Sequence, residues 1–245
     1  MRRWQFPLTL VTIGLVALSL TVVTMRGVAA DTPTAPSQQS NQIGEKLAGW
    51  EYFAAPGDGA FNVIVNYDKG SAQGINAFAA ANRQLVDQVN GSVEATVVFK
   101  QPITASEFKD LIGKSGVQVK AYTMRAISGT GLRATIAGAP LGNDLFPQAA
   151  LDGLVRNVNQ KQAGVVFKGV VTVDVTANQR QLKQLLADGR VYTTDVTQSV
   201  AIGRARAKAV TNAAMSKANV ASLPTKSRLA APLYWYMEDM GIAPQ

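Results

Sequence analysis

Residues 97–119 are VVFKQPITASEFKDLIGKSGVQV, and residues 171–193 are VTVDVTANQRQLKQLLADGRVYT. These two stretches decide the fold. When one is laid over the other, Phe108 meets Leu182 and Leu111 meets Leu185, so both central segments have an apolar face at helical spacing. The sequence therefore predicts two strand–helix–strand units. Duplication of one ancestral unit is one explanation for the similarity, and chance likeness between two such units is the other.

Both central helices are expected to begin with a capping box. Thr104 is followed three residues later by Glu107, and Asn178 is followed by Gln181. In each pair the first side chain accepts a hydrogen bond from the backbone of the third helical residue, and the later side chain bonds back to the cap. The helices should therefore start at residues 105 and 179.

Along the rest of the chain, the hydrophobic periodicity predicts both strands and helices. Strands are expected at residues 61–67, 94–100, 117–125, 132–136, 165–175 and 191–196, and helices at residues 75–89, 105–114, 145–160, 179–187 and 200–218. The central order of strand, helix, strand, strand, helix, strand is the split βαβ pattern of ferredoxin-like sheets. The predicted fold class is α+β, ferredoxin-like, with helices on one face of the sheet. That fold supports unrelated functions, so it predicts none.

The N-terminal segment predicts where the protein resides. Residues 6–25 are FPLTLVTIGLVALSLTVVTM, an uncharged run long enough to cross a bilayer as a helix of about 30 Å. Arg2 and Arg3 precede it and favour a cytoplasmic N-terminus. We expect a single-pass protein of a bacterial cell membrane, with the body extracytoplasmic and preceded by the transmembrane helix. The alternative is a signal peptide that is cleaved near Ala30, followed by secretion.

The domain organisation follows from this segment. Residues 1–30 are the expected signal anchor or signal peptide, residues 31–55 a disordered spacer, and residues 56–245 the extracytoplasmic α/β region, with halves at 56–140 and 141–245. The spacer begins with a stretch rich in Pro, Ser, Thr and Gln, which has little to bury. Its second part contains an aromatic group around Trp50, which predicts either a surface-seeking patch or a short element packed on the domain.

Composition excludes many kinds of enzyme. The chain has no cysteine and no histidine, which removes disulfides, thiolate chemistry, Ser-His-Asp hydrolases and the commonest zinc sites. Of the 24 basic residues, Arg2, Arg3 and Arg26 flank the apolar run, so 21 basic residues face 16 acidic ones in the remainder. No cofactor or metal is expected, and export from the cytoplasm makes nucleic acid an improbable partner.

Three local motifs lack the context that their chemistry requires. The Gly129–Ala134 segment resembles a dinucleotide fingerprint, but a strand rather than a helix should follow it. Gly113–Ser115 resembles the end of a P-loop, but it should end a helix and lacks the earlier glycine. Ser106 and Lys109 match a serine-enzyme motif whose remaining elements are missing.

Paired carboxylates are the remaining route to catalysis, because burial can tune one as an acid and the other as a base. Glu107 with Asp110, or Asp174 with Asp195, are the pairs that could approach each other. A solvated helix face or turn explains most of these acids equally well.

Two surface regions are candidates for contacts. The helix expected near residue 201 carries Arg204, Arg206 and Lys208, which would meet an anionic surface. The tail contains Tyr234, Trp235 and Tyr236, residue types that anchor protein interfaces. The alternatives are a solvated last helix and a tail that is pinned on the domain.

These observations together predict a membrane-tethered extracytoplasmic binding or accessory module that is not an enzyme. Its expected partners are the cytoplasmic membrane, through residues 6–25, and an envelope protein. The alternatives are a carboxylate-based enzyme acting on envelope carbohydrate or peptide, and a structural surface domain.

Overall fold

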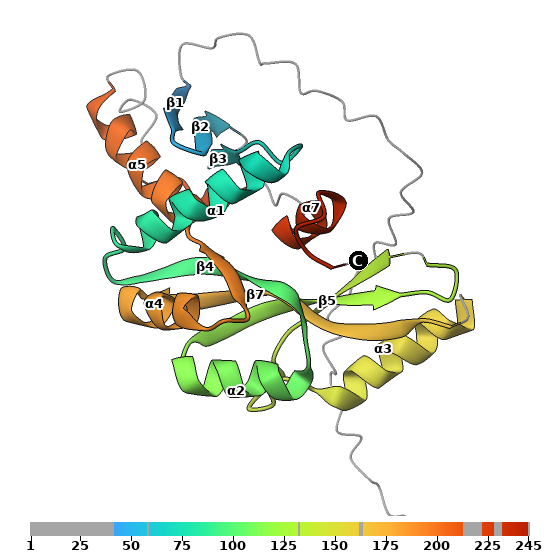
Figure 1. Ribbon diagram of the computed structural model, residues 1–245. Helices are drawn as coiled ribbons and strands as arrows, with labels where there is room; N and C mark the ends of the chain where they lie inside the picture. The colour runs from blue at the N-terminus through green and yellow to red at the C-terminus, as the bar shows by residue number, and fades with distance from the viewer. Residues whose placement is uncertain are drawn as a thin grey trace, which may run out of the picture.

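The computed structural model describes residues 42–57, 59–131, 133–161, 164–212, 222–227 and 232–244. These residues form a mixed α+β structure with two sheets (Figure 1). The strands are β1 (Ile43–Leu47), β2 (Trp50–Gly57), β3 (Ala60–Asn66), β4 (Ser92–Ile103), β5 (Gln118–Ile127), β6 (Arg133–Gly138), β7 (Val166–Asn178), β8 (Val191–Asp195) and β9 (Thr225–Ser227). The helices are α1 (Ala72–Val86), α2 (Ala105–Ser115), α3 (Gln148–Lys161), α4 (Gln179–Ala187), α5 (Thr197–Thr211) and α7 (Leu233–Asp239).

The predicted membrane span at residues 6–25 lies outside the described residues, as does the spacer up to residue 41. Within the described ranges, no helix is long and apolar enough to cross a membrane.

The large sheet has the strand order β6-β5-β7-β4-β8, and all its neighbouring strands are antiparallel. Strands from both expected halves of the chain interleave in it, because β7 lies between β5 and β4. The β4–β7 register is regular from Ser92↔Asn178 to Val98↔Thr172 and then shifts at a bulge. The six strands expected from the sequence between residues 61 and 196 are all present, with bounds that differ by a few residues.

The small sheet has the order β1-β2-β3-β9, with β9 parallel to β3. The predicted spacer is wrong for residues 43–55, which form β1 and most of β2. Trp50, Tyr52 and Ala54 alternate toward the interior and are 4%, 0% and 1% exposed, so this segment buries a full apolar face. Residues 43–55 therefore belong to the folded region.

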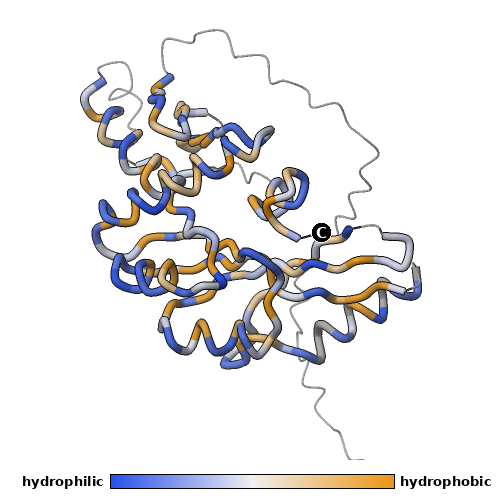
Figure 2. The backbone as a smooth tube through the Cα atoms, in the orientation of Figure 1, coloured by the Kyte–Doolittle hydropathy of each residue, from blue (hydrophilic) through white to orange (hydrophobic). Residues whose placement is uncertain are grey.

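Helices cover both sides of the large sheet, so the prediction of helices on one face is wrong. In Figure 1, α2 and α3 lie on one side of the sheet and α1 and α7 lie on the other. α4 lies against α2, since Gln181 and Gln184 donate hydrogen bonds to the carbonyl oxygens of Gly116 and Lys114. In Figure 2 both the strands and the helices change between polar and apolar along their length, as elements with one buried face do.

Both predicted capping boxes are confirmed. The Thr104 hydroxyl accepts from the Glu107 backbone at 3.2 Å, and the Glu107 carboxylate accepts from the Thr104 backbone at 2.7 Å. Asn178 and Gln181 make the same reciprocal pair at 3.0 and 2.9 Å. These contacts fix the starts of α2 and α4, which lie at residues 105 and 179 as expected.

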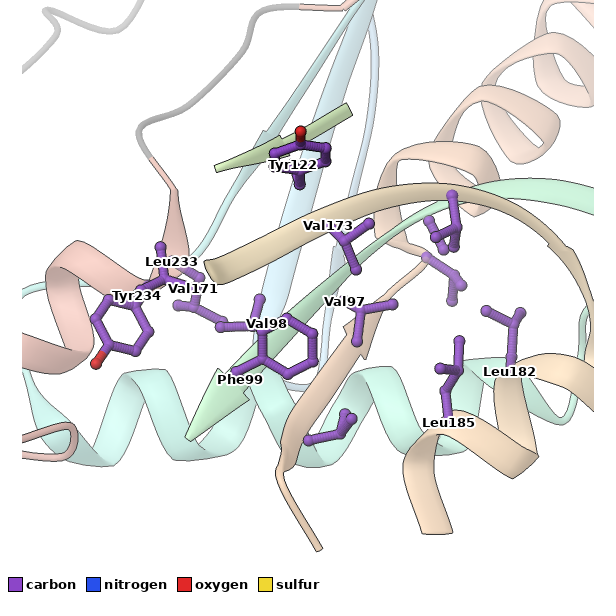
Figure 3. Close-up of a cluster of buried hydrophobic side chains, with 14 of the residues drawn as sticks. Val97, Val98, Phe99, Tyr122, Val171, Val173, Leu182, Leu185, Leu233 and Tyr234 are labelled. Atoms are coloured by element: carbon purple, nitrogen blue, oxygen red, sulfur yellow. The ribbon is translucent and has the colours of Figure 1, made fainter. Parts of the chain in front are cut away.

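The core is continuous between the layers. Figure 3 shows Leu182 and Leu185 of α4 at one end of a buried cluster and Leu233 and Tyr234 of α7 at the other, with valines of β4 and β7 between them. The short C-terminal helix is therefore part of the core.

Candidate functional site

An open hollow of about 510 Å³ lies where the ends of three strands of the small sheet meet the start of α1, and we call it the α1 hollow. It is lined by Lys46, Leu47, Gly49, Trp50, Glu51, Asn66, Tyr67, Asp68, Gln73, Gly74 and Ala77. None of these residues was a predicted site residue. The signal in the sequence is the turn between Leu47 and Trp50, followed after β3 by a run of polar and small residues.

Local hydrogen bonds fix the wall of the α1 hollow at the helix start. The Asp68 carboxylate accepts from the Gly70 backbone at 3.0 Å and from the Ser71 hydroxyl at 2.5 Å. Ser71 in turn caps α1 by accepting from the Gly74 backbone at 2.9 Å. A Cβ at Gly74 would lie 2.2 Å from the Asp68 carbonyl oxygen, so only glycine fits this close approach.

The opposite wall is the β1–β2 hairpin. Gly49 has a φ of 81°, and a Cβ there would lie 2.7 Å from the carbonyl oxygen of Ala77 in α1. This glycine satisfies a left-handed turn and lets the hairpin pack directly on the helix. The distance between the two walls is therefore set by backbone contact.

The lining combines an aromatic side with planar polar groups. The Tyr67 ring stacks on Phe78 with 3.9 Å between centroids, and burial raises the pKa of Tyr67, so its hydroxyl stays a neutral donor. Asn66 donates to the Glu51 carboxylate at 2.9 Å. Lys46 makes no ion pair with any described residue. Such a lining can hold a small polar ligand that has an apolar face.

The carboxylates Asp174 and Asp195 lie on the two strands that flank β4, so one strand separates the acids of this pair. Both are cross-strand neighbours of Thr96, whose hydroxyl donates to Asp174 at 2.6 Å. Asp195 accepts from the backbone of Thr197 at 2.9 Å. Burial, and secondarily the charge of Asp174, raises the pKa of Asp195. Burial is the main cause of the raised pKa of Tyr67, and the charge of Asp195 adds to it.

The other pair, Glu107 and Asp110, is exposed and locally engaged. Hydrogen bonds within the capping box hold the pKa of Glu107 below its usual value. Asp110 pairs with Lys114 at 2.9 Å and with Arg190 at 3.5 Å, and the bond from Lys114 is the main cause of its lowered pKa. These acids stabilise α2 and its contact with the turn before β8.

The basic residues predicted to meet an anionic surface contact the chain itself. Arg204 and Lys208 pair with Glu45 of β1 at 3.2 and 2.8 Å. The bond from Lys208 is the main cause of the lowered pKa of Glu45. Arg206 donates to the Thr225 hydroxyl at 2.6 Å. The basic side of α5 therefore fastens the small sheet to the helix.

The tail aromatics are divided between core and surface. Tyr234 is fully buried, whereas Trp235 and Tyr236 are half-buried. Arg125 lies over the Trp235 ring at 5.6 Å and Lys69 over the Tyr236 ring at 5.2 Å. For Tyr234 the structure fits the alternative of a tail pinned on the domain.

A buried ion pair anchors this tail. Arg125 of β5 forms a bidentate pair with Glu238 of α7, with the side chains 5% and 3% exposed and one bond of 3.0 Å. Arg133 of β6 adds a contact to Glu238 at 3.1 Å and one to Asp239 at 3.0 Å. Sequence inspection missed this network because its members lie more than a hundred residues apart.

The segments that resemble a dinucleotide fingerprint, a P-loop and a serine-enzyme motif have ordinary structural positions. Gly113–Ser115 ends α2, with Gly116 in the left-handed cap position, and Arg133 begins a strand instead of a helix. Ser106 lies within the first turn of α2. Among the described residues no group of three or more acids could hold a metal ion.

Comparison with protein-family models, with curated proteins and with solved structures finds no match for this chain.

Proposed function

We propose that this protein is a membrane-tethered extracytoplasmic module of a bacterial envelope that binds a ligand at the α1 hollow. The observation that carries the proposal is the α1 hollow itself, with its fixed walls and its mixture of aromatic and planar polar side chains. The uncharged run at residues 6–25 supports the tether.

The site half of this proposal is tested by photo-cross-linking in intact cells. A photoreactive benzoylphenylalanine replaces Gln73, which is exposed on the rim of the α1 hollow, and in a matched control it replaces Gln101, which is exposed on β4. We expect an adduct at position 73 that is missing at position 101. Equal labelling at both positions, or none at either, would contradict binding at the α1 hollow.

The placement half is tested separately. A reporter fused after Gln245 should be active on the outer side of the membrane and inactive in the cytosol. Carbonate extraction should leave the chain in the membrane fraction if residues 6–25 stay uncleaved, and should release it if cleavage occurs near Ala30. A reporter that is active only in the cytosol would remove the envelope role.

A carboxylate-based enzyme is the second candidate, favoured by one observation. Asp174 and Asp195 flank Thr96, and burial raises the pKa of Asp195, which favours its protonated form as a general acid would require. The test is release of soluble sugar or peptide from isolated envelopes by wild type, by Asp195→Asn and by the exposed control Asp152→Asn. Release that Asp195→Asn abolishes and Asp152→Asn retains would favour the enzyme.

A partner contact at the tail is retained for two of the three predicted residues. Trp235 and Tyr236 keep part of their rings accessible, and the neighbouring cations Arg125 and Lys69 hold those rings in place. Such rigid aromatic groups suit an envelope-protein contact. Tyr234 is left out because its side chain is buried.

For the fold, we propose a split βαβ, ferredoxin-like arrangement made of two equivalent units. Support comes from the central row of the large sheet, where Val98 and Thr172 stand opposite each other at the middle. Their outer neighbours are Thr123 on one side and Thr193 on the other. The overlay of residues 97–119 on residues 171–193 also pairs Val98 with Thr172, as two related units would, whereas it pairs Thr193 with Val119 and not with Thr123.

A further inference from the structure

We propose that the ligand of the α1 hollow is a neutral, polyhydroxylated molecule, namely one or two sugar rings of an envelope glycan. This rests on the proposed function, since it names the ligand class of the same site. It goes beyond that function because the same hollow could serve a peptide or an anion, and the lining argues against both.

Size and openness suit a saccharide unit. The volume of about 510 Å³ lies within the roughly 300–1,000 Å³ of small-ligand pockets. Its walls are the hairpin at Gly49 and the α1 start at Gly74, both fixed by backbone contacts that a Cβ would disrupt. A rigid site of this kind needs little ordering when a ligand enters, which favours binding of a small and weakly interacting molecule.

The chemistry of the lining matches a sugar ring. The half-buried Tyr67 supplies aromatic surface that attracts the C–H groups of a pyranose, whereas Trp50, only 4% exposed, lines the hollow as part of its wall. Asn66 and Glu51 are held together at 2.9 Å, so their remaining donors and acceptors have fixed directions. The Gln73 amide makes no hydrogen bond with the described residues and is available to hydroxyl groups.

Charge in the α1 hollow argues against an anionic ligand. One lysine, Lys46, faces two carboxylates, Glu51 and Asp68, so no positive field gathers there. The start of α1 is already compensated, because Ser71 is its N-cap and the Asp68 carboxylate, just before it, accepts from the Ser71 hydroxyl. A phosphate or sulfate placed there would meet the Asp68 carboxylate.

Geometry argues against an extended peptide. Peptides that bind sheets add a strand to a free edge, where main-chain groups are unpaired. The α1 hollow lies instead at strand ends, because β1 ends at Leu47, β2 begins at Trp50 and β3 ends at Asn66. A ligand that bonds through side-chain amides and hydroxyl groups fits this position better than a backbone does.

The test is direct binding to the full chain reconstituted in lipid nanodiscs. Chitotriose, cellotriose and maltotriose are each titrated and followed by saturation-transfer NMR and calorimetry. We expect saturable binding of at least one trisaccharide, with signal transfer to ring C–H protons. Gln73→Ala should weaken it about 2- to 10-fold, the loss expected for one hydrogen bond, and Gln101→Ala should leave it unchanged.

Three results would overturn the proposal. They are no saturable binding of any of the three trisaccharides, binding that Gln73→Ala leaves unaltered, and displacement of the sugar from every variant by a neutral pentapeptide at equal concentration. Both substitutions lie on exposed positions, and circular dichroism checks that each variant is folded. A specific cross-link at position 73 without trisaccharide binding would refute the glycan and leave the binding module intact.

Discussion

Replacing Glu238 by glutamine should lower the free energy of unfolding by about 3 kcal/mol. Removing one partner of a buried ion pair typically costs about 3–5 kcal/mol, because the other charge is left uncompensated in a poorly screened site. Arg125 and Glu238 qualify, with side chains only 5% and 3% exposed. The lower end of the range applies because the glutamine carbonyl can still accept one hydrogen bond from Arg125.

Urea unfolding of the full chain in detergent micelles measures this loss, with far-UV circular dichroism for the whole body and tryptophan emission for the tail. The mutant can relieve the charge by releasing α7 before the rest unfolds. In that case the part of the tryptophan emission that is lost on Trp235→Phe substitution should shift to the red ahead of the circular dichroism transition, since Trp235 lies beneath Arg125. Coincident transitions would indicate that α7 unfolds with the core.

The matched control is Asp239→Asn. Asp239 pairs with Arg133, and their side chains are 45% and 38% exposed, so the loss should stay within about 1 kcal/mol. The double variant Arg125→Met, Glu238→Leu should recover most of the stability, since apolar replacement of both members of a buried pair is often neutral or stabilising. If Glu238→Gln loses no more than Asp239→Asn, the buried pair is not the anchor of α7.

Asp195→Asn should be more stable than wild type at pH 7, because the folded carboxyl binds its proton more tightly than the unfolded one. The difference should shrink as the pH falls through the raised pKa of Asp195 and disappear below the ordinary pKa of an aspartate. Thermal unfolding from pH 4 to pH 8 measures this, and equal stability at pH 7 would contradict it. Thr104→Ala should lose about 1 kcal/mol by removing a cap, and Thr104→Ser almost nothing, as urea unfolding would show. Gly49→Ala should lose more than Gly59→Ala in the same assay, because both have positive φ but only the Cβ at position 49 would meet the Ala77 carbonyl. Equal losses would mean that the hairpin can move away from α1.

The elements with local signals could be predicted from the sequence. α4 begins and ends at the predicted residues, because Asn178 and Gln181 form a capping box and Leu182 and Leu185 mark an apolar face. β1 and β2 were missed because the polar composition before residue 43 was extended over them. The signal that could have found them is Gly49, at a tight turn between two alternating runs. α7 has only seven residues, and such a short helix is held by tertiary contacts rather than by propensity.

The contacts of the candidate residues join segments that are far apart in the sequence, so no local sequence pattern could predict them. The pairing of Glu45 with Arg204 and Lys208 joins the first strand to a helix far along the chain. From its sequence alone, the basic helix α5 is therefore predicted to bind anionic lipid, although Arg204 and Lys208 pair with Glu45 of the same chain. The approach of Asp174 to Asp195 could be proposed, but only the β4 register places both beside Thr96.

The pairing of β9 with β3 also determines when the small sheet can be completed as the newly synthesised chain folds. Thr225–Ser227 lie beside Phe61–Val63, so the sheet built from the earliest folded residues receives its last strand from nearly the end of the chain. A chain that emerges N-terminus first cannot close this sheet until residue 227 is free, and loop closure over such a separation is slow. The small sheet should therefore be completed only after residue 227 has been synthesised, and C-terminal truncation before β9 should leave β3 without this neighbour.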